Sequence, residues 1–151
     1  ILFQLDEADL RRALAHPHVM IGSDGSSLAA TGPLSEGKPH PRSYGTFPRV
    51  LGRYARDEGV LTLPAAIHKM TGMPAARLGL KDRGVIRAGA KADLVAFSPE
   101  RVADTATYEE PHRYAAGIPW VLVNGRVVIG RGEHTGALPG RVLTPADHRE
   151  P

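Results

Sequence analysis

The first half of the chain places its apolar residues at helical spacing. Residues 6–14 put Leu10 and Leu14 on one face, with acidic residues at the start and basic residues after them, as suits the dipole of a helix. The same spacing recurs in three later segments, each of which predicts a helix. Their ranges are 46–58, 62–71 and 74–78.

Two threonines mark where the longer of these helices are expected to begin. Thr46 stands before a proline that fits the first turn of a helix, and Thr62 precedes the next apolar stripe. That second stripe runs through Ile67 and Met70, which leaves Lys69 on the solvent side. We therefore expect one helix from Thr46 and another that carries a solvated lysine.

Beyond about residue 84 the apolar residues come in short runs rich in β-branched side chains, which predict strands. Asn124 and Gly125 stand between two such runs. This dipeptide predicts a tight hairpin, because a type I′ turn needs positive φ at both positions. The expected strands are 85–86, 92–97, 120–123 and 126–129.

A nearly continuous apolar run at residues 18–22 ends in a turn that carries the carboxylate of Asp24. Runs of this kind are typical of strands buried on both faces of a parallel sheet. In an α/β barrel the catalytic side chains collect at the C-terminal ends of such strands. Asp24 is therefore a candidate catalytic residue, although Asp is also common in turns for structural reasons alone.

A loop rich in Gly, Pro and Ser, residues 26–41, separates Asp24 from Arg42. A loop of this length in a compact domain is usually either functional or disordered. Arg42 offers a planar fork of donors that can bind a carboxylate through two parallel hydrogen bonds. A loop arginine can also pair with a nearby acid or backbone group, so the residues alone leave both roles open.

The composition excludes some classes of function. The net charge is +3, but the basic residues are scattered and aromatic residues make up only 5%, whereas a nucleic-acid surface needs clustered basic residues or interleaved aromatic residues. We expect no nucleic-acid partner and no membrane partner, because no apolar segment is long enough to span a bilayer. The lack of cysteine excludes a disulfide framework and thiolate ligands within this chain, and it fits a cytoplasmic enzyme.

Four blocks, in this order along the chain, resemble the C-terminal third of D-aminoacylases, the N-acyl-D-amino-acid deacylases of the metal-dependent amidohydrolase superfamily. The blocks are VMIGSDG, GKPHPRSYGTFPRVLGRYARDEGVL, AIHKMTGMPAARLGLKDRGVIRAGAKADLVAF and IPWVLVNGRVVIGRGEHTGALPGRVL. The SDG and HPRSYGTFPRVLG parts are specific to this group. The KADLVAF and VLVNGRVV parts also occur in hydantoinase-like and dihydroorotase-like relatives. The resemblance covers about residues 5–143.

The resemblance implies an α/β fold in two parts. Residues 1–80 would form the last strand and the outer helices of a TIM-type (β/α)8 barrel. Residues 81–143 would form the C-terminal strands of a small β-sandwich, followed by a tail at 144–151. A complete barrel takes about 250 residues, so we expect the 151 residues to begin at a cut point, with the N-terminal part of the same enzyme preceding them.

The resemblance also implies a reaction, the hydrolysis of a small N-acyl-D-amino acid to a carboxylic acid and the free D-amino acid. A zinc ion, held by His and Cys ligands upstream of this chain, would polarise the acyl carbonyl and acidify a bound water. Asp24 would carry the proton of that water to the departing amine, and Arg42 would hold the α-carboxylate. Tyr44 is a further candidate for substrate contact. Because none of the family's metal ligands falls within it, the chain is expected to be inactive alone.

Other polar residues that could suggest chemistry are interpreted as structural. His16 and His18 have the His-x-His spacing of a metal pair, but they precede a late strand and so belong at the wrong end of the barrel. The resemblance places Asp93 in the small β-sandwich, remote from the metal. The residues of an irregular stretch that receive no assignment are Glu109, Glu110 and His112.

Two alternatives to the deacylase remain open at this point. One is a fragment of a cyclic-amide hydrolase of the hydantoinase or dihydroorotase type, against which the HPRSYGTFPRVLG block argues. The other is a non-catalytic scaffold fragment of the same fold, which a gene without upstream metal ligands would indicate.

Overall fold

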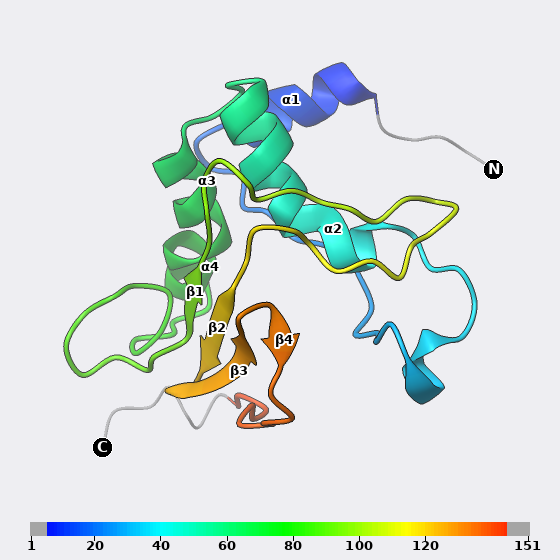
Figure 1. Ribbon diagram of the computed structural model, residues 1–151. Helices are drawn as coiled ribbons and strands as arrows, with labels where there is room; N and C mark the ends of the chain where they lie inside the picture. The colour runs from blue at the N-terminus through cyan, green and yellow to red at the C-terminus, as the bar shows by residue number, and fades with distance from the viewer. Residues whose placement is uncertain (1–5, 145–151) are drawn as a thin grey trace.

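The computed structural model describes residues 6–144, in which a group of helices is followed by a small antiparallel sheet (Figure 1). The elements are α1 (Glu7–Ala15), the 3-10 helix η1 (Gly32–Ser35), α2 (Arg42–Arg49), the π-helix η2 (Val50–Asp57), α3 (Leu63–Met70), α4 (Gly72–Arg77), β1 (Leu94–Ala96), β2 (Trp120–Val123), β3 (Arg126–Gly130) and β4 (Glu133–His134). Within residues 6–144, none of the helices has the length and apolar character that crossing a bilayer requires.

Two of the helices, α1 and α3, begin where a side chain satisfies a free backbone N–H group. The carboxylate of Asp6 accepts a hydrogen bond from the N–H of Ala8 at the start of α1, and the hydroxyl of Thr62 accepts one from Ala65 at the start of α3. The helix after the loop starts at Arg42, so the predicted start at Thr46 is wrong. Thr46 instead bonds back to the carbonyl of Arg42 from inside the helix, at 3.0 Å.

The core lies between α1, η2 and α3. Seven buried residues form it: Leu14, Val50, Leu51, Tyr54, Leu61, Ala66 and Val102. Val102 comes from the segment between β1 and β2 and is fully buried. The carbonyl oxygen of Val102 lies only 2.5 Å from the position that a Cβ on Gly52 would occupy, so η2 needs a glycine where this segment crosses it.

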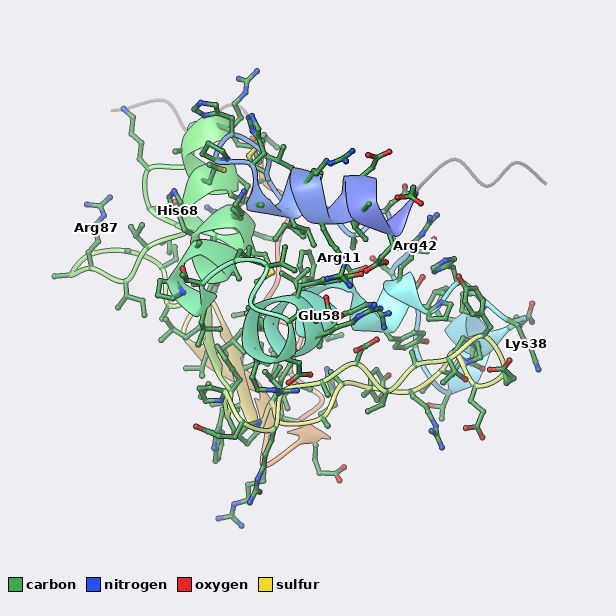
Figure 2. The ribbon with its side chains drawn as sticks, turned by 90° about the horizontal axis from the view of Figure 1, so that it is seen from above. Arg11, Lys38, Arg42, Glu58, His68 and Arg87 are labelled. Atoms are coloured by element: carbon green, nitrogen blue, oxygen red, sulfur yellow. The ribbon has the colours of Figure 1, made fainter. Side chains whose placement is uncertain are left out.

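Ionic side chains join α1 to η2 above this core. Glu58 accepts from Arg53 at 2.7 Å and forms an ion pair with Arg11 at 2.7 Å, and Figure 2 shows Arg11 and Glu58 pointing toward one another between the two helices. The hydrogen bond from Arg53, followed by those of Arg11, lowers the pKa of Glu58 below its ordinary value. The carboxylate therefore stays charged well into the acidic range.

The sheet follows the chain in the order β1-β2-β3-β4, with every neighbouring pair antiparallel. Asn124 and Gly125 have φ of +47° and +77°, which confirms the hairpin predicted between β2 and β3. The short β4 was not predicted. Residues 85–86 form no strand, so that prediction is wrong, and both side chains are exposed.

The predicted strand at residues 18–22 is also wrong for this chain, because these residues have no regular secondary structure. A β-strand exists only where a neighbour completes its hydrogen bonds. Within residues 6–144 no strand pairs with this segment. The N–H groups of His18 and Val19 bond to His16, and the N–H of Ile21 bonds to the carbonyl of Lys69 in α3. Of the predicted tail 144–151, all but Thr144 lies outside the described residues.

Candidate functional site

Asp24 stands at the centre of a sharp turn. The hydroxyl of Ser23 accepts a hydrogen bond from the N–H of Gly25 at 3.2 Å, and Asp24 itself has φ of +49°. A non-glycine residue in this left-handed region is uncommon and occurs mainly as Asn or Asp. The turn leaves the Asp24 side chain 84% exposed, so its carboxylate is open to a reacting molecule.

Gly25 brings this turn against the first turn of α2. A Cβ on Gly25 would lie 2.9 Å from the Cα of Ser43, which is closer than real Cβ contacts. Only glycine therefore allows the two backbones to approach in this way. The close approach fixes the distance between Asp24 and the start of α2 without any side chain.

Arg42 is the first residue of α2 and points back to this turn. Its Nη2 lies 2.8 Å from Oδ2 of Asp24, and the Arg42 side chain is 45% exposed. Figure 2 labels Arg42 at the beginning of α2. The structure thus brings together the two residues that the sequence singled out, although 17 positions separate them. The remaining guanidinium N–H groups can reach a second anion.

The ring of His40 contacts the first residue of α2, whose N-cap is Pro41. Its Nδ1 accepts a hydrogen bond from the N–H of Arg42 at 3.0 Å, and its Nε2 lies 2.9 Å from the hydroxyl of Tyr108. In a neutral ring, an accepting Nδ1 requires that Nε2 carries the hydrogen. Nε2 therefore donates to Tyr108, which ties the capping ring to a distant part of the chain.

Tyr44, also in the first turn of α2, has a comparable partner. Its hydroxyl lies 2.9 Å from Nδ1 of His112, whose Nε2 lies 3.0 Å from the carbonyl of Gly37. A carbonyl can only accept, so Nε2 carries the hydrogen and Tyr44 donates to Nδ1. Burial, and then the neighbouring Tyr114, raises the pKa of Tyr44 above its ordinary value, which keeps this donor protonated.

The three aromatic partners all come from residues 99–117, the segment between β1 and β2, which we call the strap. In Figure 1 the strap leaves β1, runs along α2 and returns to β2. Besides Tyr108 and His112, its Tyr114 accepts a hydrogen bond from the N–H of Ala30 at 3.1 Å. The strap therefore holds the loop 26–41 at three places.

Sequence reasoning missed the strap as part of this site. Two of the four tyrosines of the chain, Tyr108 and Tyr114, lie in it with His112 between them. Such a cluster of aromatic and His residues in a stretch without periodicity was the available signal. The contacts join positions 68 to 84 residues apart, so no local pattern could identify the partners.

Asp93 has a structural role, as predicted. Its carboxylate accepts from the N–H of Asn124 at 2.7 Å and also pairs with Arg83, so it secures the hairpin turn. His16 and His18 meet edge to face in an exposed position. Within residues 6–144 no three His, Cys, Asp or Glu side chains lie close enough to hold a metal ion.

Comparison with known sequences gives a match to the family described as "Amidohydrolase family" over residues 6–129. The D-aminoacylase of Alcaligenes xylosoxydans xylosoxydans is 54% identical over 143 residues, which make up 95% of this chain and 28% of that protein. The chain therefore spans less than a third of the length of this curated relative.

Solved structures give the same picture. One is a D-aminoacylase with a binuclear metal center, which matches 88% of this chain and 27% of its own with a TM-score of 0.79 and 49% identity. Another is the N-acyl-D-glutamate deacylase from Bordetella bronchiseptica in complex with zinc and a phosphonate inhibitor. It matches 84% of this chain and 27% of its own, with a TM-score of 0.74 and 44% identity.

Proposed function

Because this chain belongs to the amidohydrolase family, we propose that it is the C-terminal part of a deacylase that hydrolyses small N-acyl-D-amino acids. The observation that carries the proposal is the exposed carboxylate of Asp24, held 2.8 Å from the guanidinium of Arg42. One group suits proton transfer and the other suits recognition of a carboxylate, and both roles are needed at one place.

Asp24 takes a proton from the water that attacks the amide carbonyl. It then gives this proton to the nitrogen as the C–N bond breaks, which releases the carboxylic acid and the D-amino acid. A positioned acid/base of this kind is typically worth about 10²–10⁴ in rate. Arg42 holds the α-carboxylate of the substrate and fixes which enantiomer presents its amide to Asp24.

Tyr44, two positions after Arg42 in α2, is proposed as a second substrate contact. Since its O–H group donates to His112, its oxygen remains to accept a hydrogen bond from a substrate N–H. The loop 26–41, with the strap behind it, forms the wall that faces the acyl group and the D-side chain.

Zinc is the metal we propose for the complete enzyme, in line with the zinc complex of the Bordetella bronchiseptica deacylase. The described residues of this chain do not form a zinc site by themselves, because zinc requires three or four ligands. We propose that the ligands that complete the zinc site lie outside residues 6–144.

The same reasoning extends to the fold. We propose that residues 1–80 close a TIM-type barrel and that residues 81–143 complete a small β-sandwich. Two observations support this. The segment 18–22 has apolar side chains and, among residues 6–144, no strand partner. Residues 19–22 line a groove of about 260 Å³ together with α1, α2 and η2. A preceding barrel strand would fill this groove and would complete the backbone hydrogen bonds of residues 18–22.

The test compares two variants in the complete enzyme. Asp24→Asn should abolish turnover of N-acyl-D-amino acids while the zinc content stays at the wild-type level. Arg42→Lys should mainly raise KM, because a point charge replaces a two-pronged donor. The measurements are kcat, KM and metal analysis. A near-normal kcat for Asp24→Asn would remove Asp24 from the mechanism, and faster turnover of hydantoins or dihydropyrimidines would indicate a cyclic-amide hydrolase instead.

A further inference from the structure

Lys69 is buried in the structure, whereas the sequence pattern predicted a solvent-exposed side chain. The predicted apolar stripe of α3 put Lys69 in solvent, but the residue is only 5% exposed. It shares the buried face of α3 with Ala66. A lysine is almost never buried unless its ammonium group has partners, so the contacts of Lys69 require an explanation.

All these contacts go to the backbone of residues 16–21, which lead from the end of α1 toward Asp24. The ammonium group donates to the carbonyl of Val19 at 3.0 Å and to the carbonyl of His16. The carbonyl of Lys69 accepts from the N–H of Ile21 at 3.2 Å. One residue of α3 therefore binds this segment at three points.

The charge of Lys69 is compensated by dipoles. His16 is the C-cap of α1, so the ammonium lies at the negative end of that helix, where a cation is favoured. Among the described residues no carboxylate forms an ion pair with it, and carbonyl oxygens supply the negative charge instead. An ammonium group without those carbonyls would be costly to bury, so the lysine and the segment depend on each other.

We propose that Lys69 is a positioning residue for Asp24, a role that rests on the deacylase function proposed above. Asp24 follows Ile21 by three positions, and Gly25 on its other side rests against Ser43. The carboxylate is thus held between two anchors, α3 through Lys69 and α2 through the close backbone approach. Among residues 6–144, these contacts with Lys69 are what hold residues 19–21 against α3.

The test uses the complete enzyme and the variant Lys69→Met, which keeps the length of the side chain and removes the donors. Hydrogen exchange followed by mass spectrometry should show the peptide spanning residues 17–24 exchanging about tenfold faster or more. The kcat for an N-acyl-D-amino acid should fall about 10- to 100-fold with KM changed less than about threefold, because a small displacement of a catalytic group costs rate and leaves binding largely intact.

Two further variants keep the result interpretable. Thr62→Ala removes the N-cap of the same helix, so it lowers the melting temperature, but it should leave both the exchange of residues 17–24 and kcat near wild type. Lys69→Gln keeps a shorter donor and should give intermediate values of both. If Lys69→Met does not fold, the comparison of Lys69→Gln with Thr62→Ala decides the question.

Wild-type exchange of residues 17–24 in Lys69→Met would overturn the proposal. So would faster exchange with kcat within twofold of wild type, because Lys69 would then hold the segment without affecting Asp24. A wild-type enzyme that does not hydrolyse N-acyl-D-amino acids would instead contradict the proposed function. The exchange measurement alone would then decide whether Lys69 holds this segment against α3.

Discussion

The hydroxyl group of Tyr44 and the ring of His112 form a part-buried hydrogen bond beside α2. The exposed pair of Tyr108 and His40 also joins a tyrosine hydroxyl to a His ring at 2.9 Å, but here the ring donates and the hydroxyl accepts. Loss of a hydrogen bond costs most where the partner left behind cannot turn to water. The two hydrogen bonds have the same length, but we expect the part-buried one to contribute more to the free energy of unfolding.

Tyr44→Phe should lower the free energy of unfolding by about 1 kcal/mol, because Nδ1 of His112 loses its donor in a part-buried position. The matched control is Tyr108→Phe, which removes the same hydroxyl at a residue that is 68% exposed and should cost less than about 0.5 kcal/mol. Urea unfolding of both variants measures this. Equal losses would contradict the role assigned to burial.

Single residues show where sequence reasoning succeeds. Asp24 and Arg42 were singled out from local chemistry and from family motifs, and the structure brings them together. Lys69 was placed on the wrong face, because a helical stripe says which side is apolar but not that the backbone of another segment can solvate an ammonium group. His112 received no role, since its partners lie 68 and 75 positions away.

At the scale of elements, the backbone contact between the Asp24 turn and α2 is the most sensitive junction of the site. Gly25→Ala should push the turn away from Ser43, because its Cβ would stand 2.9 Å from a backbone carbon that cannot rotate aside. We expect a loss of about 1–3 kcal/mol in stability, as in other overpacked positions, and reduced turnover in the complete enzyme.

The control for this change is Gly22→Ala, three positions earlier in the same segment. A Cβ at Gly22 meets nothing within 4 Å, so this variant should stay within about 0.5 kcal/mol of wild type. Urea unfolding of the 151-residue chain compares the two. A Gly25→Ala variant as stable as Gly22→Ala would show that the turn can move without cost.

The link between α1 and η2 predicts a pH dependence. Since the folded-state pKa of Glu58 lies below its ordinary value of 4.5, folding favours the charged form. This contribution is fully present above about pH 4.5 and disappears as the pH falls through the lower, folded-state pKa. Glu58→Gln should therefore reduce the melting temperature more at about pH 7 than at about pH 3.

The matched control is Glu36→Gln, at an exposed glutamate that forms no ion pair with the described residues. It should change the melting temperature equally little at both pH values. A Glu58→Gln effect that is constant with pH would mean that packing, and not charge, joins the two helices.

Elements were predictable to the extent that local rules determine them. The caps at Asp6 and Thr62 and the hairpin at Asn124 all follow from short-range hydrogen bonds or turn geometry. Residues 18–22 were predicted to be a strand but form none, because a strand requires a partner that the described residues do not supply. The start of α2 at Arg42 was missed because its N-cap is Pro41, without a side-chain capping bond, and the N–H of Arg42 bonds instead to the ring of His40.

At the scale of the whole molecule, the chain spans 28% of the length of its curated relative and contains one part of the proposed site. The 151-residue chain supplied with zinc should show no turnover of N-acyl-D-amino acids and no bound zinc at equal stoichiometry. The reason is that Asp24 has no metal-binding neighbours among the described residues. Turnover assays and metal analysis, run beside the complete enzyme, measure both quantities. Hydrolysis by the chain alone would contradict this division of the site.

The contacts between the strap and the loop 26–41 limit how the substrate preference of the enzyme can be altered. The strap connects β1 to β2, and its Tyr108, His112 and Tyr114 form hydrogen bonds with the loop 26–41. A loop transplanted from a deacylase with another acyl preference would meet foreign aromatic partners. Engineers who wish to exchange substrate preferences should therefore move both stretches as one cassette, and natural variants should diverge in the two stretches together.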